Sequence, residues 1–200
     1  MKIKSNNRKY VFLGDTDSIN IELIIKSHNF LKDKLKFIII CDKTEMTNYM
    51  KKIKSKIKIN EILDPMKFQN YKKSQINIFN VENKFKEKFK NLLNQLHISN
   101  QLCTATGYDL ITMPIDKSVF KKKINFIGIT EYLGKINKKN TFMLMQGESF
   151  SIIPLTTHIN LKDIHKNLLE KNIKKKLKNI LETLDKSKLS YNYIKFLCYN

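Results

Sequence analysis

Three side chains of chemically useful types stand at or just beyond the ends of apolar runs. His158 ends the run Ile-Ile-Pro-Leu-Thr-Thr-His, Thr130 stands in a Gly-Ile-Thr-Glu segment, and Lys117 follows an apolar strand that runs into a proline. In open α/β sheets, ligands bind beyond the carboxyl ends of the strands. We therefore expect Thr130 and His158 to open on one cleft at that edge of a sheet.

His158 offers an imidazole, the commonest metal ligand among protein side chains. A divalent ion held there could polarise a hydroxyl group that is being oxidised. One histidine does not make a metal site, however. His28, His97 and His165 fall within or at the ends of expected helices, without a partner at ligand spacing, and we interpret them as structural. On the residues alone, a structural role is also the favoured interpretation of His158.

The segment around Thr130 is typical of a helix start, where free backbone N–H groups and the helix dipole attract phosphate. The simpler alternative is that Thr130 only caps this helix. Lys117 could face an anionic substrate as a point charge. On its own it is one more solvated lysine, as are the lysine clusters at 51–58, 121–123 and 174–176.

Strand and helix patterns alternate along the chain that must position these residues. The part from 109 to 163 reads as strand, loop, helix, strand pair and loop. This alternation predicts an α/β fold, with a mostly parallel sheet covered by helices. The other expected strands lie at 10–13, 36–41, 57–63, 76–79 and 193–197, and the other expected helices at 18–30, 44–56, 83–97, from 160 and from 172.

Composition favours a globular, cytoplasmic protein. Hydrophobic residues make up 42% of the 200 residues, which suits one domain or two small lobes. No apolar run approaches the roughly 20 residues that cross a bilayer, and the apolar run at 10–13 is too short for a signal peptide. Cys41, Cys103 and Cys198 are isolated, which predicts free or buried thiols in a reducing compartment.

The formal net charge of +20 raises the question of nucleic-acid binding. Arg8 is the only arginine among 38 basic residues, whereas arginine is the preferred residue for bidentate phosphate and guanine contacts. The lysine surplus is more typical of an AT-rich coding bias. We predict no specific nucleic-acid partner and only weak, salt-dependent contact with polyanions.

Taken in order, the three segments resemble the 4-hydroxythreonine-4-phosphate dehydrogenases of pyridoxal phosphate biosynthesis. In that family a Thr-Thr-His before a helix supplies a metal-binding histidine, which matches His158. The family also has Gly-His-Thr-Glu, in which the histidine and the threonine contact the phosphorylated substrate. Thr130 matches that threonine, whereas Ile129 replaces the histidine and cannot donate to phosphate.

Two further segments carry the resemblance. Lys117 matches the lysine of a Gly-Pro-x-x-Lys motif, in which Met113 replaces the glycine and should crowd the turn. The family's Gly-Glu-Pro-Ala-Gly-Ile-Gly-Pro-Glu loop corresponds to 14–22, where Gly14, Asp15, Ile19 and Glu22 remain. The chain contains no Gly-x-Gly-x-x-Gly fingerprint.

The resemblance implies an NAD-dependent oxidoreductase with a divalent metal (Zn, Mg, Mn or Co). Its substrate is the small phosphorylated amino acid 4-phosphooxy-threonine, whose oxidation is followed by loss of carbon dioxide. It implies a two-lobed homodimer, with residues 1–200 as the first part of an isocitrate/isopropylmalate dehydrogenase-like fold and no assigned lobe boundary. The resemblance implies that Thr130 and Lys117 contact the substrate and that His158 binds the metal.

The resemblance also implies that this chain is truncated. Asn200 resembles the first residue of the family's Asn-Pro-His-Ala-Gly-Glu motif, so we expect an incomplete unit that shows little turnover alone. Two alternatives remain open: a non-catalytic remnant or binding module that keeps the core of the fold, and a lysine-rich domain that binds polyanions.

Overall fold

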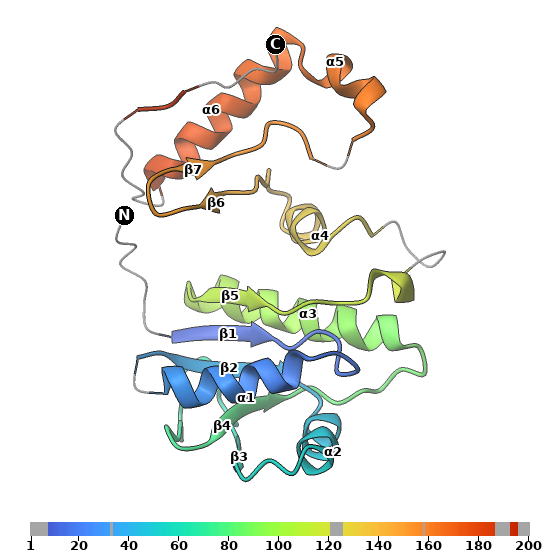
Figure 1. Ribbon diagram of the computed structural model, residues 1–200, viewed down its shortest axis with the longest axis vertical. Coiled ribbons are helices and arrows are strands. Elements are labelled where there is room, and N and C mark those ends of the chain that lie inside the picture. The colour runs from blue at the N-terminus through green and yellow to red at the C-terminus, as the bar shows by residue number, and fades with distance from the viewer. Residues whose placement is uncertain (1–7, 33, 121–125, 158, 187–192, 196–200) are drawn as a thin grey trace. The chain divides into compact units, whose positions relative to one another are not determined.

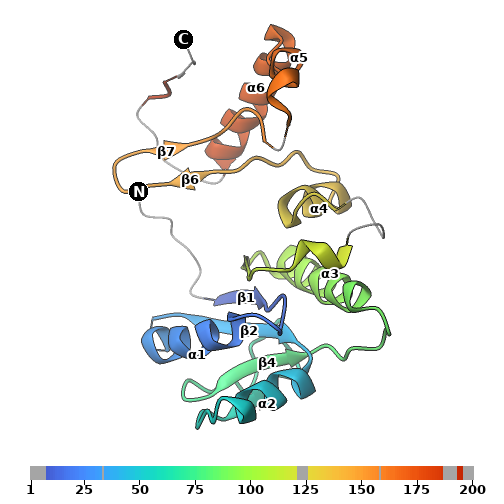
Figure 2. The same ribbon diagram turned by 45° about the vertical axis from the view of Figure 1, so that its right-hand side comes forward.

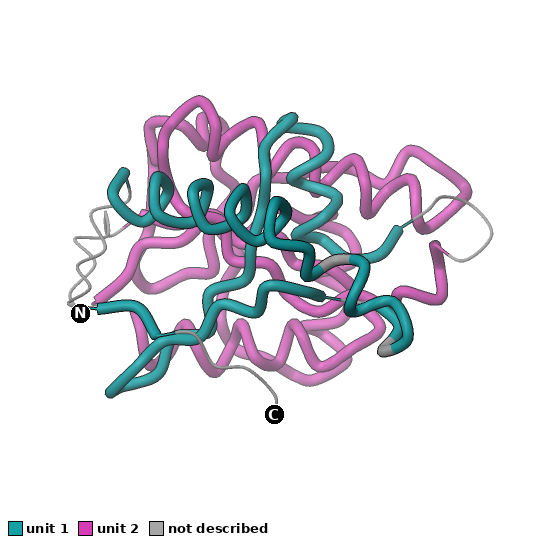
Figure 3. Tube along the Cα trace, turned by 90° about the horizontal axis from the view of Figure 1, so that it is seen from above, with its two compact units in different colours: residues 1–4, 126–200 teal, residues 5–125 magenta. Residues whose placement is uncertain are grey.

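The computed structural model describes residues 8–32, 34–120, 126–157, 159–186 and 193–195 (Figure 1). The chain divides into two compact units, a larger one of residues 5–125 and a smaller one of residues 126–200 together with 1–4 (Figure 3).

The larger unit is built on a sheet of five strands in the order β3-β4-β2-β1-β5, and every adjacent pair is parallel. This confirms the predicted mostly parallel α/β fold. At the centre, Val11 of β1 pairs with Ile39 of β2 and with Ile111 of β5. The strands are β1 (Arg8–Phe12), β2 (Lys36–Cys41), β3 (Ile59–Glu61), β4 (Ile76–Asn80) and β5 (Asp109–Thr112).

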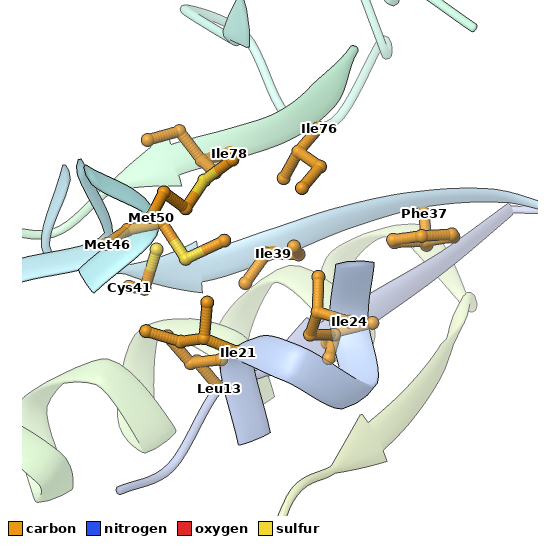
Figure 4. Close-up of a cluster of buried hydrophobic side chains, with 11 residues drawn as sticks. Leu13, Ile21, Ile24, Phe37, Ile39, Cys41, Met46, Met50, Ile76 and Ile78 are labelled. Atoms are coloured by element: carbon orange, nitrogen blue, oxygen red, sulfur yellow. The ribbon is translucent and has the colours of Figure 1, made fainter. Parts of the chain in front are cut away.

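Helices cover both faces of this sheet because the central strands are apolar on both faces. In β2, alternate residues point to opposite sides: Ile39 packs in one buried cluster, and Ile38 and Ile40 pack in the other. Residues of α1 (Asn20–Leu31) and α2 (Lys43–Lys52) complete the first cluster (Figure 4). Residues of α3 (Lys88–Thr106) complete the second. The predicted strand 36–41 is thereby confirmed, with the same bounds.

Helix α3 begins later and ends later than the predicted 83–97. The segment before it is held in another conformation, because the Asn91 side chain bonds both the N–H (2.9 Å) and the C=O (2.8 Å) of Phe85. The helix ends at Gly107, whose backbone has the left-handed φ of 70° that ends many helices. A side chain inside the helix therefore sets its start, which apolar periodicity does not reveal.

The smaller unit holds short elements around a longer helix. They are α4 (Ile129–Ile136), the antiparallel pair β6 (Met145–Gln146) and β7 (Ser151–Ile152), the 3-10 turn η2 (Leu161–Asp163), α5 (Ile164–Asn167) and α6 (Glu170–Lys186). Figure 2 shows β6 and β7 between α4 and α6. The predicted strand pair is confirmed, although its second strand ends at Ile152. Pro154 lies just beyond and has no N–H for a strand ladder.

The predicted strand at 193–197 is wrong for the described residues, since Tyr193–Lys195 adopt no regular secondary structure. Residues 196 and 197 lie outside the described part of the chain. None of the described helices has both the length and the apolar character needed to cross a membrane.

Two thiols and one imidazole of the larger unit are packed against its core: Cys41 and His28 are buried, and Cys103 is half-buried. Cys41 and Cys103 are free, and burial raises the pKa of the Cys103 thiol to about 11. The fully buried Cys41 thiol has its pKa raised further for the same reason. His28 is a buried residue of α1, with its ring edge-on to Phe37, and burial lowers its pKa. Cys41 and Cys103 pack in the two apolar clusters of the sheet, and His28 packs against Phe37, which supports a structural role for all three.

Candidate functional site

The strand order of the larger unit points to one place at its carboxyl edge. From β1 the chain crosses to β2 on one side, whereas β5 joins β1 on the other side. Such a reversal of strand order leaves a crevice between the loops that leave the two strands, and ligands of open α/β sheets bind there. The loops concerned are 13–19 after β1 and 113–116 after β5.

These two loops are joined directly to each other. The backbone N–H of Asp15 donates to the Pro114 carbonyl oxygen (3.2 Å), and the Asn20 side-chain amide donates to the same oxygen (2.8 Å). A Cβ atom on Gly14 would lie 2.5 Å from that oxygen. The two loops are therefore in direct backbone contact. These contacts hold the segment 113–116, which leads to Lys117, against the loop after β1.

Lys117 is the first residue of the 3-10 turn η1 (Lys117–Phe120), and its side chain is exposed. The turn is held at both ends. Asp116 Oδ1 accepts a hydrogen bond from the Ser118 N–H (2.8 Å), and buried Phe120 packs edge-on against Phe89, with ring centroids 6.4 Å apart. Lys117 is thus exposed on a turn that follows β5 at the carboxyl edge of the sheet.

Met113 does not crowd this turn in the way we expected. Its side chain packs against the buried cluster of α1, α2 and the sheet. The close backbone approach is made by Gly14 instead, whose φ of 70° suits a residue without a side chain. The missing side chain that lets the two loops approach closely is therefore that of Gly14, in the loop after β1, and not that of residue 113.

Carboxylates at this edge are occupied by neighbouring groups. Lys88 Nζ contacts Asp15 Oδ1 (2.7 Å) and Asp17 Oδ2 (2.6 Å). Asp42 caps α2 by accepting from the Glu45 N–H (2.9 Å), and its other oxygen accepts a backbone N–H from beyond β4. Burial raises the pKa of Glu45. Among the described residues, no group of three or more His, Cys, Asp or Glu side chains could hold a metal ion.

The smaller unit contains an open cavity of about 820 Å³ between α4, α6 and the segment after β7. Thr130 lines it from α4, and Thr156 and Thr157 line it from the segment after β7. His158 lies outside the described residues, so its place at this cavity stays a prediction. Lys117 belongs to the larger unit and does not line this cavity.

Helix α4 opens on this cavity without a side-chain cap. Gly128 is the N-cap residue, in an extended conformation, and within the described residues no side-chain hydrogen bond caps the helix. Thr130 is the second residue of the helix and is exposed. The interpretation of Thr130 as a helix cap is therefore wrong, because glycine occupies the cap position. The first backbone N–H groups of a helix have no partner within it, which suits a bound anion.

Sequence reasoning missed the basic lining of this cavity. The cluster 174–176 was expected to be a solvated face. Lys174 and Lys175 are indeed exposed, but Lys175 and Lys176 also line the cavity. Lys176 Nζ donates to the Leu155 carbonyl oxygen (2.6 Å), which ties α6 to the segment after β7. Lysines from the end of α4 face the same space. Only the packing of α6 against that segment reveals this, and no local pattern encodes it.

Comparison with known proteins agrees with this fold. The family described as "Pyridoxal phosphate biosynthetic protein PdxA" matches residues 33–200. The 4-hydroxythreonine-4-phosphate dehydrogenase of Campylobacter fetus subsp. fetus is 27% identical over 165 residues, which are 82% of this chain and 52% of the relative. The enzyme of that name from Aquifex aeolicus is 28% identical over 191 residues, 92% of this chain and 60% of the relative.

Solved structures share the fold. A putative 4-hydroxythreonine-4-phosphate dehydrogenase from Salmonella typhimurium superposes with a TM-score of 0.75 at 17% identity, covering 90% of this chain and 60% of that chain. The enzyme from Burkholderia phymatum gives 0.72 at 16%, covering 90% and 58%. This chain thus spans between about half and three-fifths of the length of these proteins. It belongs to the family of the pyridoxal phosphate biosynthetic protein PdxA, whose curated relatives are 4-hydroxythreonine-4-phosphate dehydrogenases.

Proposed function

We propose that this chain supplies substrate-binding residues to an oxidoreductase of pyridoxal phosphate biosynthesis that acts on 4-phosphooxy-threonine. The observation that carries the proposal is the cavity of the smaller unit. It brings together Thr130, at the uncapped start of α4, with Thr156 and Thr157 from a segment far along the chain. Both segments lie within 109–163, the part of the chain in which the family resemblance is sharp.

The chemistry assigned to these residues is recognition of the phosphate group. Backbone N–H groups of the first turn of α4 would donate to phosphate oxygens, supported by the helix dipole. The Thr130 hydroxyl is exposed at that end and would add a further donor. Lys117, an exposed residue of the larger unit, is a separate candidate for contact with an anionic substrate, as the family resemblance suggests. The first turn of α4 and the Thr130 hydroxyl would hold the substrate by its phosphate group.

The family's cofactors are part of the proposal: NAD, and a divalent metal (Zn, Mg, Mn or Co) that would polarise the alcohol being oxidised. The described residues do not fit a metal centre, and the one candidate ligand, His158, lies outside them. The role proposed for the described residues is therefore substrate binding. A homodimer and a cytoplasmic location belong to the same proposal.

A second candidate is a binding module that keeps the substrate site without turnover. Ile129 favours it, because the first residue of α4 carries a half-buried hydrocarbon side chain where the family has a histidine. The two candidates differ in one assay, in which the chain is mixed with NAD, a divalent metal and 4-phosphooxy-threonine and reduced nicotinamide is followed by absorbance. Metal-dependent turnover supports the enzyme, and binding without turnover supports the module.

Substitution of Thr130 tests the substrate-binding role. We expect Thr130→Val, which keeps the shape and removes the hydroxyl, to weaken calorimetric binding of 4-phosphooxy-threonine by about tenfold, the value of one hydrogen bond to a charged group. Thr130→Ser retains the hydroxyl and should bind within about threefold of the parent chain. Equal affinity of the Val and Ser variants for the phosphorylated substrate would remove Thr130 from the site.

A further inference from the structure

The larger unit carries its positive charge mainly at one end of its sheet. All adjacent strands are parallel, so the strands begin at the same end (Figure 1). We call this end the amino edge and define it as residues 8–9, 30–32, 34–36, 53–58, 68–75 and 107–109. Arg8 begins β1 and Lys36 begins β2. The segments that lead into β2, β3 and β4 add the exposed lysines Lys32, Lys34, Lys54, Lys56, Lys58 and Lys72.

Carboxylates do not balance these cations. Asp109 is the only carboxylate among the residues of the amino edge as defined, all of them described, and it pairs with Lys9. Other ion pairs of the unit lie at the carboxyl edge, as in Lys43–Glu61 (2.7 Å). Within the described part of the chain, none of the six exposed lysines makes an ion pair. The amino edge therefore presents a positive field to solvent, which attracts polyanions.

Phe30, near the end of α1, is a large aromatic side chain exposed on this charged edge. It is 73% exposed and lies outside both buried clusters of the sheet. The Nζ atom of Lys34 lies 4.7 Å from its ring centroid. An exposed ring with a cation beside it can receive a planar group that is attached to a negative charge.

Arg8 and Lys36 are held on further rings of the same edge. They are register partners in β1 and β2, where like charges repel each other. Lys36 Nζ lies 5.8 Å from the ring centroid of Tyr71, and the Arg8 guanidinium lies 5.4 Å from that of Phe68. Phe68 has a φ of 54°, in the left-handed region that side chains disfavour, and such strain is frequent at ligand sites. A bound anion would relieve the repulsion between the two cations.

We propose that the amino edge binds single-stranded nucleic acid without selecting a base sequence. The lysines and Arg8 contact phosphates, and a base stacks on Phe30. Stacking accepts any base, and lysine contacts phosphate as a point charge. The exposed ring favours nucleic acid over an acidic protein surface, which offers carboxylates without regularly spaced planar groups. These rings and cations are spread over residues 8–108 and meet only in the fold. The surface uses none of the residues proposed for substrate binding.

The first test is a fluorescence anisotropy titration of the 200-residue chain with labelled oligothymidylate of about 12 nucleotides. We expect saturable binding at low salt, with an affinity that falls steeply as salt is added. An abasic oligodeoxynucleotide of the same length keeps the phosphates and lacks the bases, so it should bind about fivefold more weakly or worse. Absence of saturable binding at low salt, or equal binding of the abasic probe, would overturn the proposal.

Two double variants separate a defined surface from general attraction by net charge. Lys34→Gln combined with Lys36→Gln should weaken oligothymidylate binding by about tenfold or more. The matched control combines Lys84→Gln with Lys86→Gln. These two lysines are also exposed and two residues apart, but they lie between β4 and α3, outside the amino edge. The control removes the same charge and should weaken binding by less than about threefold. Equal losses in the two variants would mean that net charge alone attracts the probe.

A pair of phenylalanine variants tests stacking without a change of charge. Phe30→Leu should weaken oligothymidylate binding by about fivefold or more and leave binding of the abasic probe unchanged. Phe85→Leu replaces a ring that is 46% exposed before α3, outside the amino edge, and should bind both probes as the parent chain does. Both substitutions replace exposed side chains and should keep the melting temperature. Unchanged binding by Phe30→Leu would contradict the stacking role. Polyglutamate that displaces the oligonucleotide at equal charge concentration would assign the edge to an acidic protein instead.

Discussion

Gly14→Ala should destabilise the chain by about 3 kcal/mol or more, against a total stability of about 5–15 kcal/mol for a typical domain. Two costs add at this position. The φ of 70° disfavours a side chain, by about 1–2 kcal/mol. A Cβ atom would also lie 2.5 Å from the Pro114 carbonyl oxygen and 3.0 Å from that of Met113, and backbone atoms cannot swing aside as the end of a side chain can. Urea denaturation of the parent chain and the variant gives the difference.

Gly107→Ala is the matched control. Gly107 has the same φ of 70°, but a Cβ atom there would meet nothing within 4 Å. It should therefore cost only the conformational part, about 1–2 kcal/mol. Equal losses at the two positions would show that the loops after β1 and β5 can move apart freely, contrary to the packing described for them.

Asn20→Ala should lower the free energy of unfolding by about 3–5 kcal/mol. The substitution removes a side-chain amide that holds the loops after β1 and β5 to the start of α1. Asn20 is fully buried, and its amide nitrogen contacts the carbonyl oxygens of Leu13 (2.8 Å), Asp15 (3.1 Å) and Pro114 (2.8 Å). Removing the amide takes this donor from the carbonyl oxygens of Leu13 and Asp15, at about 1–3 kcal/mol each, whereas the Pro114 oxygen keeps the Asp15 N–H. The loss should appear as a lower urea midpoint with an unchanged slope.

Asn91→Ala provides the comparison for this second prediction. Asn91 is also buried, but it makes two side-chain hydrogen bonds, and both go to the backbone of Phe85, six residues away on the same segment. Its removal frees one local turn and should cost about 1–2 kcal/mol. A larger loss at Asn91 than at Asn20 would mean that the junction of the loops after β1 and β5 contributes little to stability.

The parallel sheet could be predicted from sequence because its signals are local. In β2 an unbroken apolar run of strand length ends at Asp42, which caps the next helix. Buried strands of this kind are typical of sheets covered on both faces. The same reasoning was wrong at the start of α3, where the Asn91 side chain overrides the apolar spacing. Side chains that bond a backbone several residues away leave no periodic trace.

The candidate site could be predicted only in part. Thr130 was singled out from its motif, and the structure places it in a cavity with Thr156 and Thr157. The lysines of that cavity could not be predicted, because Lys135 and Lys175 meet only through packing of elements distant in the sequence. The role of Asn20 was missed for the same reason, since its partner Pro114 lies 94 residues away. Long-range contacts of polar side chains need the fold first.

The central claim is that the first turn of α4 receives the phosphate of the substrate. Its most direct measurement is a titration of the isotopically labelled 200-residue chain with 4-phosphooxy-threonine, followed through the backbone amide signals by nuclear magnetic resonance. We predict that the amides of Ile129, Thr130 and Glu131 shift saturably and more than those of the larger unit's core, and that unphosphorylated threonine leaves them unchanged. If the phosphorylated compound leaves these amide signals unshifted, or if threonine shifts them equally, the substrate does not bind where we propose.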